Sequence, residues 1–201
     1  MRGVILASAS QRRSEILASC GIVHVAVPSE IEEIPGGKRP ISEVVEINAV
    51  RKAEAAQKAR KGSGDVIIGA DTLVMCGDAV IGKPTGEEEV RAMLRTFSGR
   101  AIFVYTGICV IDTSSGREAA GVDKSEIIAR RLSEGDADKY LPLLGPYDKA
   151  GGFSVEGAGA MLFDDIRGSY FNILGLSLVR LKELFERAGL DILDFIDKDK
   201  L

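Results

Sequence analysis

Apolar residues form two kinds of pattern along the chain: short continuous runs, typical of buried strands, and stretches with a three- or four-residue repeat, typical of amphipathic helices. The runs predict strands at Val4–Leu6, Val23–Val27, Val66–Met75, Ala79–Ile81, Ala101–Asp112, Glu118–Ala129 and Met161–Ile166. The repeats predict helices at Gln11–Cys20, Ser42–Lys61, Thr85–Phe97, Ser133–Leu144 and Leu176–Ala188. We interpret these elements as parts of an open α/β sheet.

Polar residues at the element boundaries predict caps and turns. Ser8 and Ser10 follow the first strand and are expected to cap the next helix, and Ser42 is expected to cap the helix after that. Thr85 and Glu88 have the spacing of a capping box. Residues 168–172 are predicted as a loop, and the alternating tail over 191–201 as a short helix without an assigned function.

Two arginines, Arg12 and Arg13, lie in the first turn of the first predicted helix. Cations are disfavoured there because the helix dipole is positive at this end. A phosphate chain would reverse that penalty, since backbone N–H groups, guanidinium groups and serine hydroxyls such as that of Ser8 would bind it together. The alternative is a solvated helix face on which one arginine pairs with Glu15.

Composition narrows the class of protein. The 201 residues suffice for one core, or for one core divided into two lobes by a cleft. The net charge of −4 argues against a general nucleic-acid binder, so an anion site must be local. No apolar run reaches the roughly 18 residues of a membrane span, and the first residues lack the apolar core of a signal peptide. We therefore expect a cytoplasmic protein without a membrane partner.

Cysteine and histidine usage limits the chemistry. Cys20, Cys76 and Cys109 are odd in number and widely spaced, which favours reduced thiols over disulfides or a zinc site. The only histidine, His24, lies in a strand-like run, which favours a structural role. Acid–base chemistry is therefore expected from carboxylates, lysines or tyrosines.

Acidic residues supply the candidates. Asp71 follows a buried run, and open α/β sheets bind their ligands outside the carboxyl ends of strands. Glu30, Glu32 and Glu33 form a dense group in a predicted loop. This group is interpreted either as a solvated acidic loop or as a source of ligands for a divalent cation. Lys52, on the second predicted helix, is either a surface charge or a phosphate contact.

One motif is a false match. Residues 77–83 fit the first part of the P-loop pattern Gly-x-x-x-x-Gly-Lys. Pro84 stands where a magnesium-binding hydroxyl is required and removes a backbone donor. Ala79–Ile81 is typical of a strand. We therefore reject a P-loop and keep Lys83 as a candidate phosphate contact.

Taken together, short motifs between residues 7 and 176 resemble one family, the Maf-like nucleotide pyrophosphatases, which are structurally similar to the inosine triphosphatases. The motifs run in family order. They are Ala7-Ser8-Ala9-Ser10-Gln11-Arg12-Arg13, Glu32-Glu33, Lys52-Ala53, Gly69-Ala70-Asp71-Thr72, Gly82-Lys83-Pro84, Ser98-Gly99-Arg100, Thr106-Gly107, Asp148-Lys149-Ala150-Gly151 and Gly168-Ser169-Tyr170 with Gly175-Leu176.

The resemblance implies a single domain over residues 1–201, with a mixed twisted sheet in two lobes around a central cleft, and often a homodimer. It implies hydrolysis of nucleoside triphosphates to the monophosphate and pyrophosphate with Mg²⁺ or Mn²⁺, which would cleanse the nucleotide pool. It also implies roles for particular residues: Asp71 as proton acceptor and metal ligand, Glu33 as metal ligand or second acid, Lys52 and Lys83 as catalytic cations, and Ser8, Arg12 and Arg13 in substrate binding.

Base preference within the family follows three positions, which match Arg12, Thr72 and Glu156. Members that prefer dTTP and UTP usually carry Arg, Thr and Gln there, whereas members that prefer 7-methyl-GTP carry Trp, Gln and Glu. This chain has the first pattern at two positions and the second at Glu156. The resemblance therefore favours dTTP and UTP, with 7-methyl-GTP as the alternative.

Functions of other classes stay open. A nucleotide-binding regulator of cell division would bind nucleotide with little turnover, but the presence of Asp71, Glu33, Lys52 and Lys83 favours the enzyme because a binder has little need of a proton acceptor. A sugar-phosphate or nucleic-acid-processing enzyme is disfavoured, since the net charge is acidic and no basic stripe is present.

Overall fold

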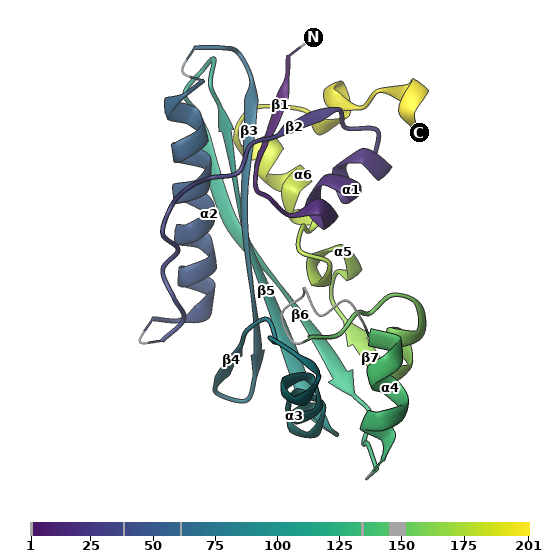
Figure 1. The fold of residues 1–201 in the computed structure, drawn as a ribbon. Helices are drawn as coiled ribbons and strands as arrows, with labels where there is room; N and C mark the ends of the chain where they lie inside the picture. The colour runs from purple at the N-terminus through teal and green to yellow at the C-terminus, as the bar shows by residue number, and fades with distance from the viewer. Residues whose placement is uncertain (1, 38, 61, 134, 145–151) are drawn as a thin grey trace. The chain divides into compact units, whose positions relative to one another are not determined.

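The computed structural model describes residues 2–37, 39–60, 62–133, 135–144 and 152–201 (Figure 1). The predicted Asp148–Gly151 motif lies outside the described residues. The strands are β1 (Val4–Ala7), β2 (His24–Ala26), β3 (Val66–Cys76), β4 (Ala79–Ile81), β5 (Ala101–Asp112), β6 (Glu118–Ala129) and β7 (Phe163–Arg167). The helices are α1 (Gln11–Ser19), α2 (Ile41–Lys58), α3 (Glu87–Phe97), α4 (Asp136–Leu144), α5 (Tyr170–Ile173) and α6 (Leu178–Arg187), with 3₁₀ turns at Gly157–Leu162, Ile192–Phe195 and Lys198–Lys200.

The strands form one mixed sheet in the order β2-β1-β3-β5-β6-β7, with β4 paired to β3. β1 runs parallel to both of its neighbours, so that Val4 lies opposite His24 on one side and Val66 on the other. β4 is antiparallel to β3, and β7 is antiparallel to β6. The prediction of a mixed α/β sheet is confirmed, and β4 occupies the segment that argued against a P-loop.

The chain divides into two compact units. The first contains Met1–Thr72, Tyr105–Asp123 and Phe171–Leu201, and the second contains Leu73–Val104 and Lys124–Tyr170. The predicted single domain of two lobes around a cleft stays a prediction.

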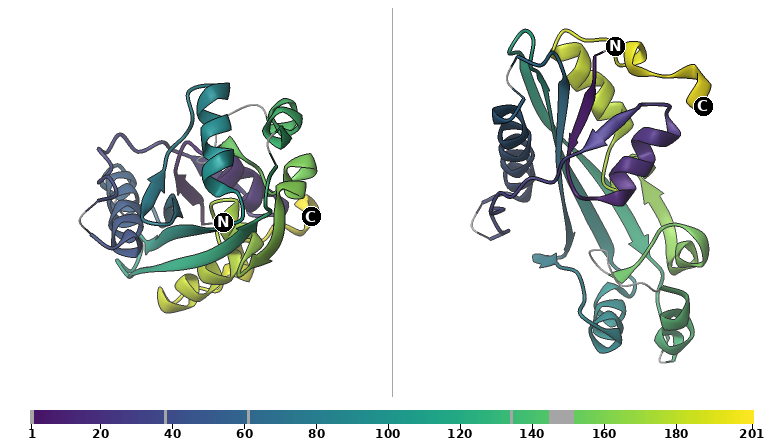
Figure 2. Two further views of the ribbon diagram at one scale, coloured as in Figure 1. Left: turned by 90° about the horizontal axis from the view of Figure 1, so that it is seen from below. Right: turned by 45° about the horizontal axis from the view of Figure 1, so that its top comes forward.

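The first unit has a core on each face of its strands. The alternation within β1 decides which side chains face which layer: Val4 and Leu6 join one core, and Ile5 and Ala7 join the other. The first core is covered by α1 and α6, as in Figures 1 and 2, through Leu17, Phe185 and their neighbours. The second core is covered by α2, which contributes the small residues Ala49, Ala53 and Ala56.

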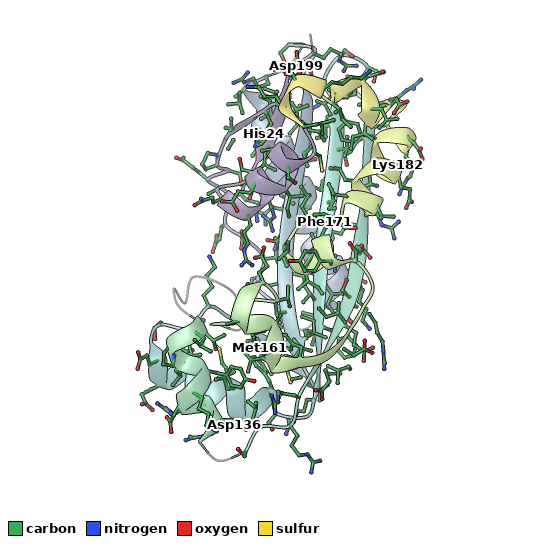
Figure 3. All side chains as sticks on the ribbon, turned by 90° about the vertical axis from the view of Figure 1, so that its right-hand side faces the viewer. His24, Asp136, Met161, Phe171, Lys182 and Asp199 are labelled. Carbon is green, nitrogen blue, oxygen red and sulfur yellow. The ribbon has the colours of Figure 1, made fainter. Side chains whose placement is uncertain are left out.

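The second unit is held by aromatic packing and by contacts of α4 with α3 and with the 3₁₀ turn Gly157–Leu162. Phe153 lies between Phe97 and Phe163, with ring centroids 5.7 and 5.1 Å away and edge-on geometry in both pairs. Met161, labelled in Figure 3, is exposed.

Two predicted caps are wrong. α2 begins at Ile41 after Pro40, and in the described part of the chain no side chain caps it, so Ser42 is simply its second residue. α3 begins at Glu87 after Gly86. Thr85 donates to Glu89 instead of pairing with Glu88, from its backbone N–H at 2.8 Å and from its hydroxyl at 3.0 Å.

Several boundaries differ from the prediction. Residues predicted as a loop at 168–172 include the start of the short helix α5. The strand predicted from Met161 begins only at Phe163, because Gly157–Leu162 forms a 3₁₀ turn. The last helix begins at Leu178, where the Ser177 hydroxyl accepts from a backbone N–H, and the tail forms 3₁₀ turns. Among the described residues, no helix has the length and apolarity needed to cross a membrane.

His24, labelled in Figure 3, packs against α1 through hydrogen bonds. Its Nδ1 lies 2.9 Å from the carbonyl oxygen of Ile22, which can only accept, so the neutral ring carries its proton on Nδ1. Its Nε2 then accepts from Ser14 Oγ at 2.6 Å. The three cysteines are free thiols. Both predictions of structural roles agree with these observations.

Candidate active site

Two glycines let α2 lie unusually close to the sheet. A Cβ atom at Gly69 in β3 would lie 2.2 Å from the carbonyl oxygen of Ala49, and one at Gly107 in β5 would lie 2.2 Å from that of Val45. Only glycine permits such an approach of helix backbone to strand. The approach brings two side chains of α2, Asn48 and Lys52, onto the segment that contains Asp71.

Lys52 joins the two predicted acids. Its ammonium lies 2.8 Å from Asp71 Oδ1 and 2.5 Å from Glu33 Oε1, and it also donates to the carbonyl oxygen of Ala70 at 3.4 Å. Lys52 and Asp71 are buried, at 7% and 5% exposure, whereas the Glu33 side chain is half exposed. The predicted grouping of these three residues is present, and Lys52 is a buried partner of carboxylates instead of a surface charge.

Asn48 is a second side chain of α2 that binds Asp71, and the sequence analysis did not identify it. Its Nδ2 donates to Asp71 Oδ2 at 2.9 Å and to the carbonyl oxygen of Ile34 at 3.0 Å, and its Oδ1 accepts from the Ile34 N–H at 2.8 Å. Asn48 lies four residues before Lys52, so both residues occupy one face of α2. That spacing is the only signal in the sequence that points to it.

The Arg13 guanidinium forms hydrogen bonds within the protein. Four of its five N–H groups donate to protein acceptors: Nε to the Gly175 carbonyl at 2.8 Å, Nη1 to Ser8 Oγ at 2.8 Å and to the Ala70 carbonyl at 2.9 Å, and Nη2 to Thr72 Oγ1 at 2.9 Å. Arg13 therefore holds the backbone around Asp71 in place. Binding of a phosphate by Arg13 stays a prediction.

Burial lowers the pKa of Arg13 from its ordinary value, and the negative charges of Asp71 and Glu33 oppose that shift. An arginine remains protonated at neutral pH under such conditions. The buried positive charges of Arg13 and Lys52 thus stand beside the two carboxylates, so the site balances charge internally.

The start of α1 agrees with its predicted capping. Ser10 is the N-cap, and its hydroxyl accepts from the Arg13 N–H. Ser8 is buried and accepts from the Ser10 N–H at 3.2 Å, as well as from Arg13. Arg12 lies in the first turn and is partly exposed. Glu15, the predicted partner of an arginine, accepts from Gln11 at 2.8 Å.

Thr72 belongs to the same network. Its hydroxyl lies 3.0 Å from Thr106 Oγ1 and 3.4 Å from the Gly175 carbonyl, in addition to accepting from Arg13. Thr106 in turn donates to the Asn172 carbonyl at 3.2 Å. Thr72 is therefore held by residues from three separate segments of the first unit.

Two predicted site residues belong to the second unit. Lys83 is exposed and follows β4, and Glu156 is exposed, with its N–H donating to Ser154 Oγ at 3.2 Å. Their participation in one site with Asp71 stays a prediction.

The donor set around Lys52 fits a divalent cation that is shared with a phosphate. Asp71 and Glu33 are brought close together because each binds the Lys52 ammonium through one carboxylate oxygen. Mg²⁺ is commonly bound by one or two carboxylates together with substrate phosphates. In the described ranges, no group of three or more histidine, cysteine, aspartate or glutamate side chains forms a metal cage. The two carboxylates are chemically suited to a divalent cation, and binding of one stays a prediction.

Comparison with known proteins assigns the chain to a family. The family model described as Maf-like protein matches residues 3–188. The chain belongs to this family. Its Maf-like relatives include proteins named dTTP/UTP pyrophosphatase from Dictyoglomus thermophilum, which is 39% identical over 94% of this chain and 98% of that protein, and from Desulforamulus reducens, which is 36% identical over 96% of this chain and 100% of that protein. A protein of the same name from Bacillus cereus is 33% identical over 96% of this chain and 98% of that protein.

A solved structure is partly similar. The Ham1 protein of Staphylococcus aureus matches 67% of this Maf-like chain and 75% of its own chain, at 15% sequence identity and a TM-score of 0.46. A match of this extent adds nothing to the family assignment.

Proposed function

We propose that this chain is a nucleoside triphosphate pyrophosphatase that hydrolyses dTTP and UTP to the nucleoside monophosphate and pyrophosphate. The observation that carries the proposal is the buried Lys52–Asp71 pair, with Glu33 on the same ammonium, in a chain whose relatives over nearly their full length are named dTTP/UTP pyrophosphatase. A buried carboxylate can serve as the proton acceptor that hydrolysis requires, and a simple binder has little need of such a group.

The reaction adds water to the α phosphorus and breaks the bond from that phosphorus to the bridging oxygen, so that pyrophosphate leaves. Asp71 accepts the proton of the attacking water, because the sole histidine is engaged with Ser14 and Ile22. Lys52 offsets negative charge that develops on the phosphate oxygens.

Asp71 and Glu33 are the residues that would hold a divalent cation, Mg²⁺ or Mn²⁺, which when bound neutralises phosphate charge and polarises the reacting phosphate. Arg12, near the positive end of the α1 dipole, and Lys83 are assigned to the phosphate chain. Ser8 and Arg13, which are joined by a hydrogen bond, are assigned to substrate binding at the same end of the site.

Base recognition is assigned to Arg12, Thr72 and Glu156. The pyrimidine preference is supported by the names of the relatives, whereas a carboxylate at Glu156 is also suited to a cationic 7-methylguanine ring. The proposal further places the protein in the cytoplasm, as a homodimer that removes surplus nucleotides from the pool.

The experiment measures pyrophosphate release from dTTP, UTP, CTP, 7-methyl-GTP, ITP and the standard purine triphosphates, with Mg²⁺, with Mn²⁺ and with chelator. Release from dTTP and UTP that needs the metal is the expected result. Release only from 7-methyl-GTP would show that this nucleotide, and not dTTP or UTP, is the substrate. Nucleotide binding without release from any substrate would favour the regulator of cell division.

A further inference from the structure

Asn48 is a buried polar side chain that contacts the candidate active site and has no assigned role. It is 1% exposed, and its amide makes three hydrogen bonds in the described structure. Both of its N–H groups and its oxygen therefore have partners. A buried amide with all these bonds formed has one orientation and resists rotation.

The partners also determine which way the amide points. The Ile34 N–H requires an acceptor, and Asp71 Oδ2 requires a donor. Only the orientation with Oδ1 toward Ile34 N and Nδ2 toward Asp71 satisfies both. The side chain therefore acts as a rigid link between the backbone of Ile34 and the carboxylate of Asp71.

This link fixes two acids at once. Asn48 binds Oδ2 of Asp71 while Lys52 binds Oδ1, so the carboxylate is held at both oxygens and cannot turn about its own axis. Ile34 directly follows Glu33, whose Oε1 binds Lys52. Two adjacent turns of α2 thereby set the separation of Asp71 from Glu33.

The neutrality of Asn48 matters as much as its hydrogen bonds. Asp71 and Glu33 carry two negative charges, and Lys52 and Arg13 carry two positive charges beside them. A cation at position 48 would add a third positive charge and repel a divalent cation, whereas a carboxylate would repel Asp71. An amide donates to Asp71 and leaves this balance of charge unchanged.

We propose that Asn48 is a positioning residue for the hydrolytic step, which holds the Asp71 carboxylate and the Glu33 loop in their reactive arrangement. This inference rests on the proposed function. Residues that orient metal-binding or proton-accepting groups typically change activity by about 10- to 100-fold when removed. The effect is expected in kcat, because Asn48 is buried behind Asp71 and touches it through the oxygen that Lys52 does not bind.

The test uses three variants of the full chain with Mg²⁺ and dTTP. Asn48→Leu removes all three hydrogen bonds and keeps the branched shape of the side chain, and Asn48→Asp keeps an acceptor for the Ile34 N–H but loses the donor to Asp71. Val44→Ala, at another fully buried position of α2, is the control for lost packing. Thermal unfolding midpoints are measured for each.

The expected result is a kcat reduced about 10- to 100-fold in both Asn48 variants, with a KM within roughly threefold of the wild type. Val44→Ala is expected to lower the unfolding midpoint while retaining kcat. A wild-type kcat in the Asn48 variants, a loss confined to KM, or a kcat loss that Val44→Ala matches would overturn the positioning role. Absence of turnover in the wild type would instead overturn the proposed function, and the positioning role with it.

Discussion

Arg13 brackets Asp71 by binding the residue on each side of it: the carbonyl of Ala70 at 2.9 Å and the hydroxyl of Thr72 at 2.9 Å. The backbone that carries Asp71 is thus held by a guanidinium, while its carboxylate is held by Lys52 and Asn48. Arg13 therefore supports the backbone of the site, while Lys52 and Asn48 orient its carboxylate.

Arg12 and Arg13 are therefore expected to differ when each is replaced by alanine. Arg13→Ala removes four hydrogen bonds of a buried cation and should lower the unfolding free energy by roughly 2–4 kcal/mol. Arg12→Ala should leave stability nearly unchanged and raise the KM for dTTP about tenfold or more, the cost of one charged hydrogen bond to phosphate. Urea unfolding and steady-state kinetics distinguish the two, and equal stability losses would contradict the assignment.

Close packing of α2 against β5 is expected to be required for both stability and turnover. Gly107→Ala places a Cβ atom 2.2 Å from the Val45 carbonyl oxygen, so α2 must move outward. We expect a loss of roughly 1–3 kcal/mol in unfolding free energy, together with reduced turnover because Lys52 and Asn48 move with the helix. Gly37→Ala, where nothing lies within 4 Å of the added atom, is the matched control. Full activity of Gly107→Ala would show that the approach is not required.

Asp112 is expected to stabilise the protein in a pH-dependent way. Burial alone would raise the pKa of its carboxyl, but hydrogen bonds from Ser114 and Ser115 and the charge of Arg2 outweigh burial and hold this pKa well below its usual range. The stabilisation is therefore present above the unfolded-state pKa of about 4 and is lost as pH falls toward the folded-state value.

The measurement is urea unfolding of Asp112→Asn at pH 7 and at pH 3. We expect the variant to be less stable than the wild type by about 1–2 kcal/mol at pH 7 and the difference to shrink at pH 3. Asp194→Asn, at an exposed position, is the control and should change stability little at either pH. A difference that is the same at both pH values would refute the electrostatic explanation.

Glu156 is expected to influence base preference. Glu156→Gln gives the side chain a donor in addition to an acceptor, which should raise the ratio of kcat/KM for dTTP over 7-methyl-GTP roughly tenfold. The control is Glu88→Gln in the same unit, whose side chain is 92% exposed and which should leave the ratio unchanged. An unaltered substrate ranking in Glu156→Gln would remove Glu156 from base recognition.

The sequence predicted the framework well because buried strands leave a strong local signal. β5 and β6 have the bounds that their apolar runs predicted, and β1 differs by one residue. Caps were less predictable, since a shift of one residue, from Glu88 to Glu89, changes which side chain reaches Thr85. Such choices depend on the geometry of the helix start and not on residue type.

The interior contacts of the site were not predictable from local pattern. Two partners of Arg13, Ala70 and Gly175, lie 57 and 162 residues away in the chain. Asn48 interrupts an apolar stripe without matching any motif, and its role appears only when α2, Ile34 and Asp71 are brought together. The family resemblance identified the charged residues of the site, but the structure was needed to show which of them interact with Arg13 and Asn48.

The role of Asp71 is tested by comparing wild-type protein and Asp71→Asn for pyrophosphate release from dTTP with Mg²⁺, alongside nucleotide affinity. We expect metal-dependent release by the wild type, a loss of about 100-fold or more in the variant, and nucleotide affinity that is largely retained. Equal turnover by the two proteins would contradict the role of Asp71 as the proton acceptor.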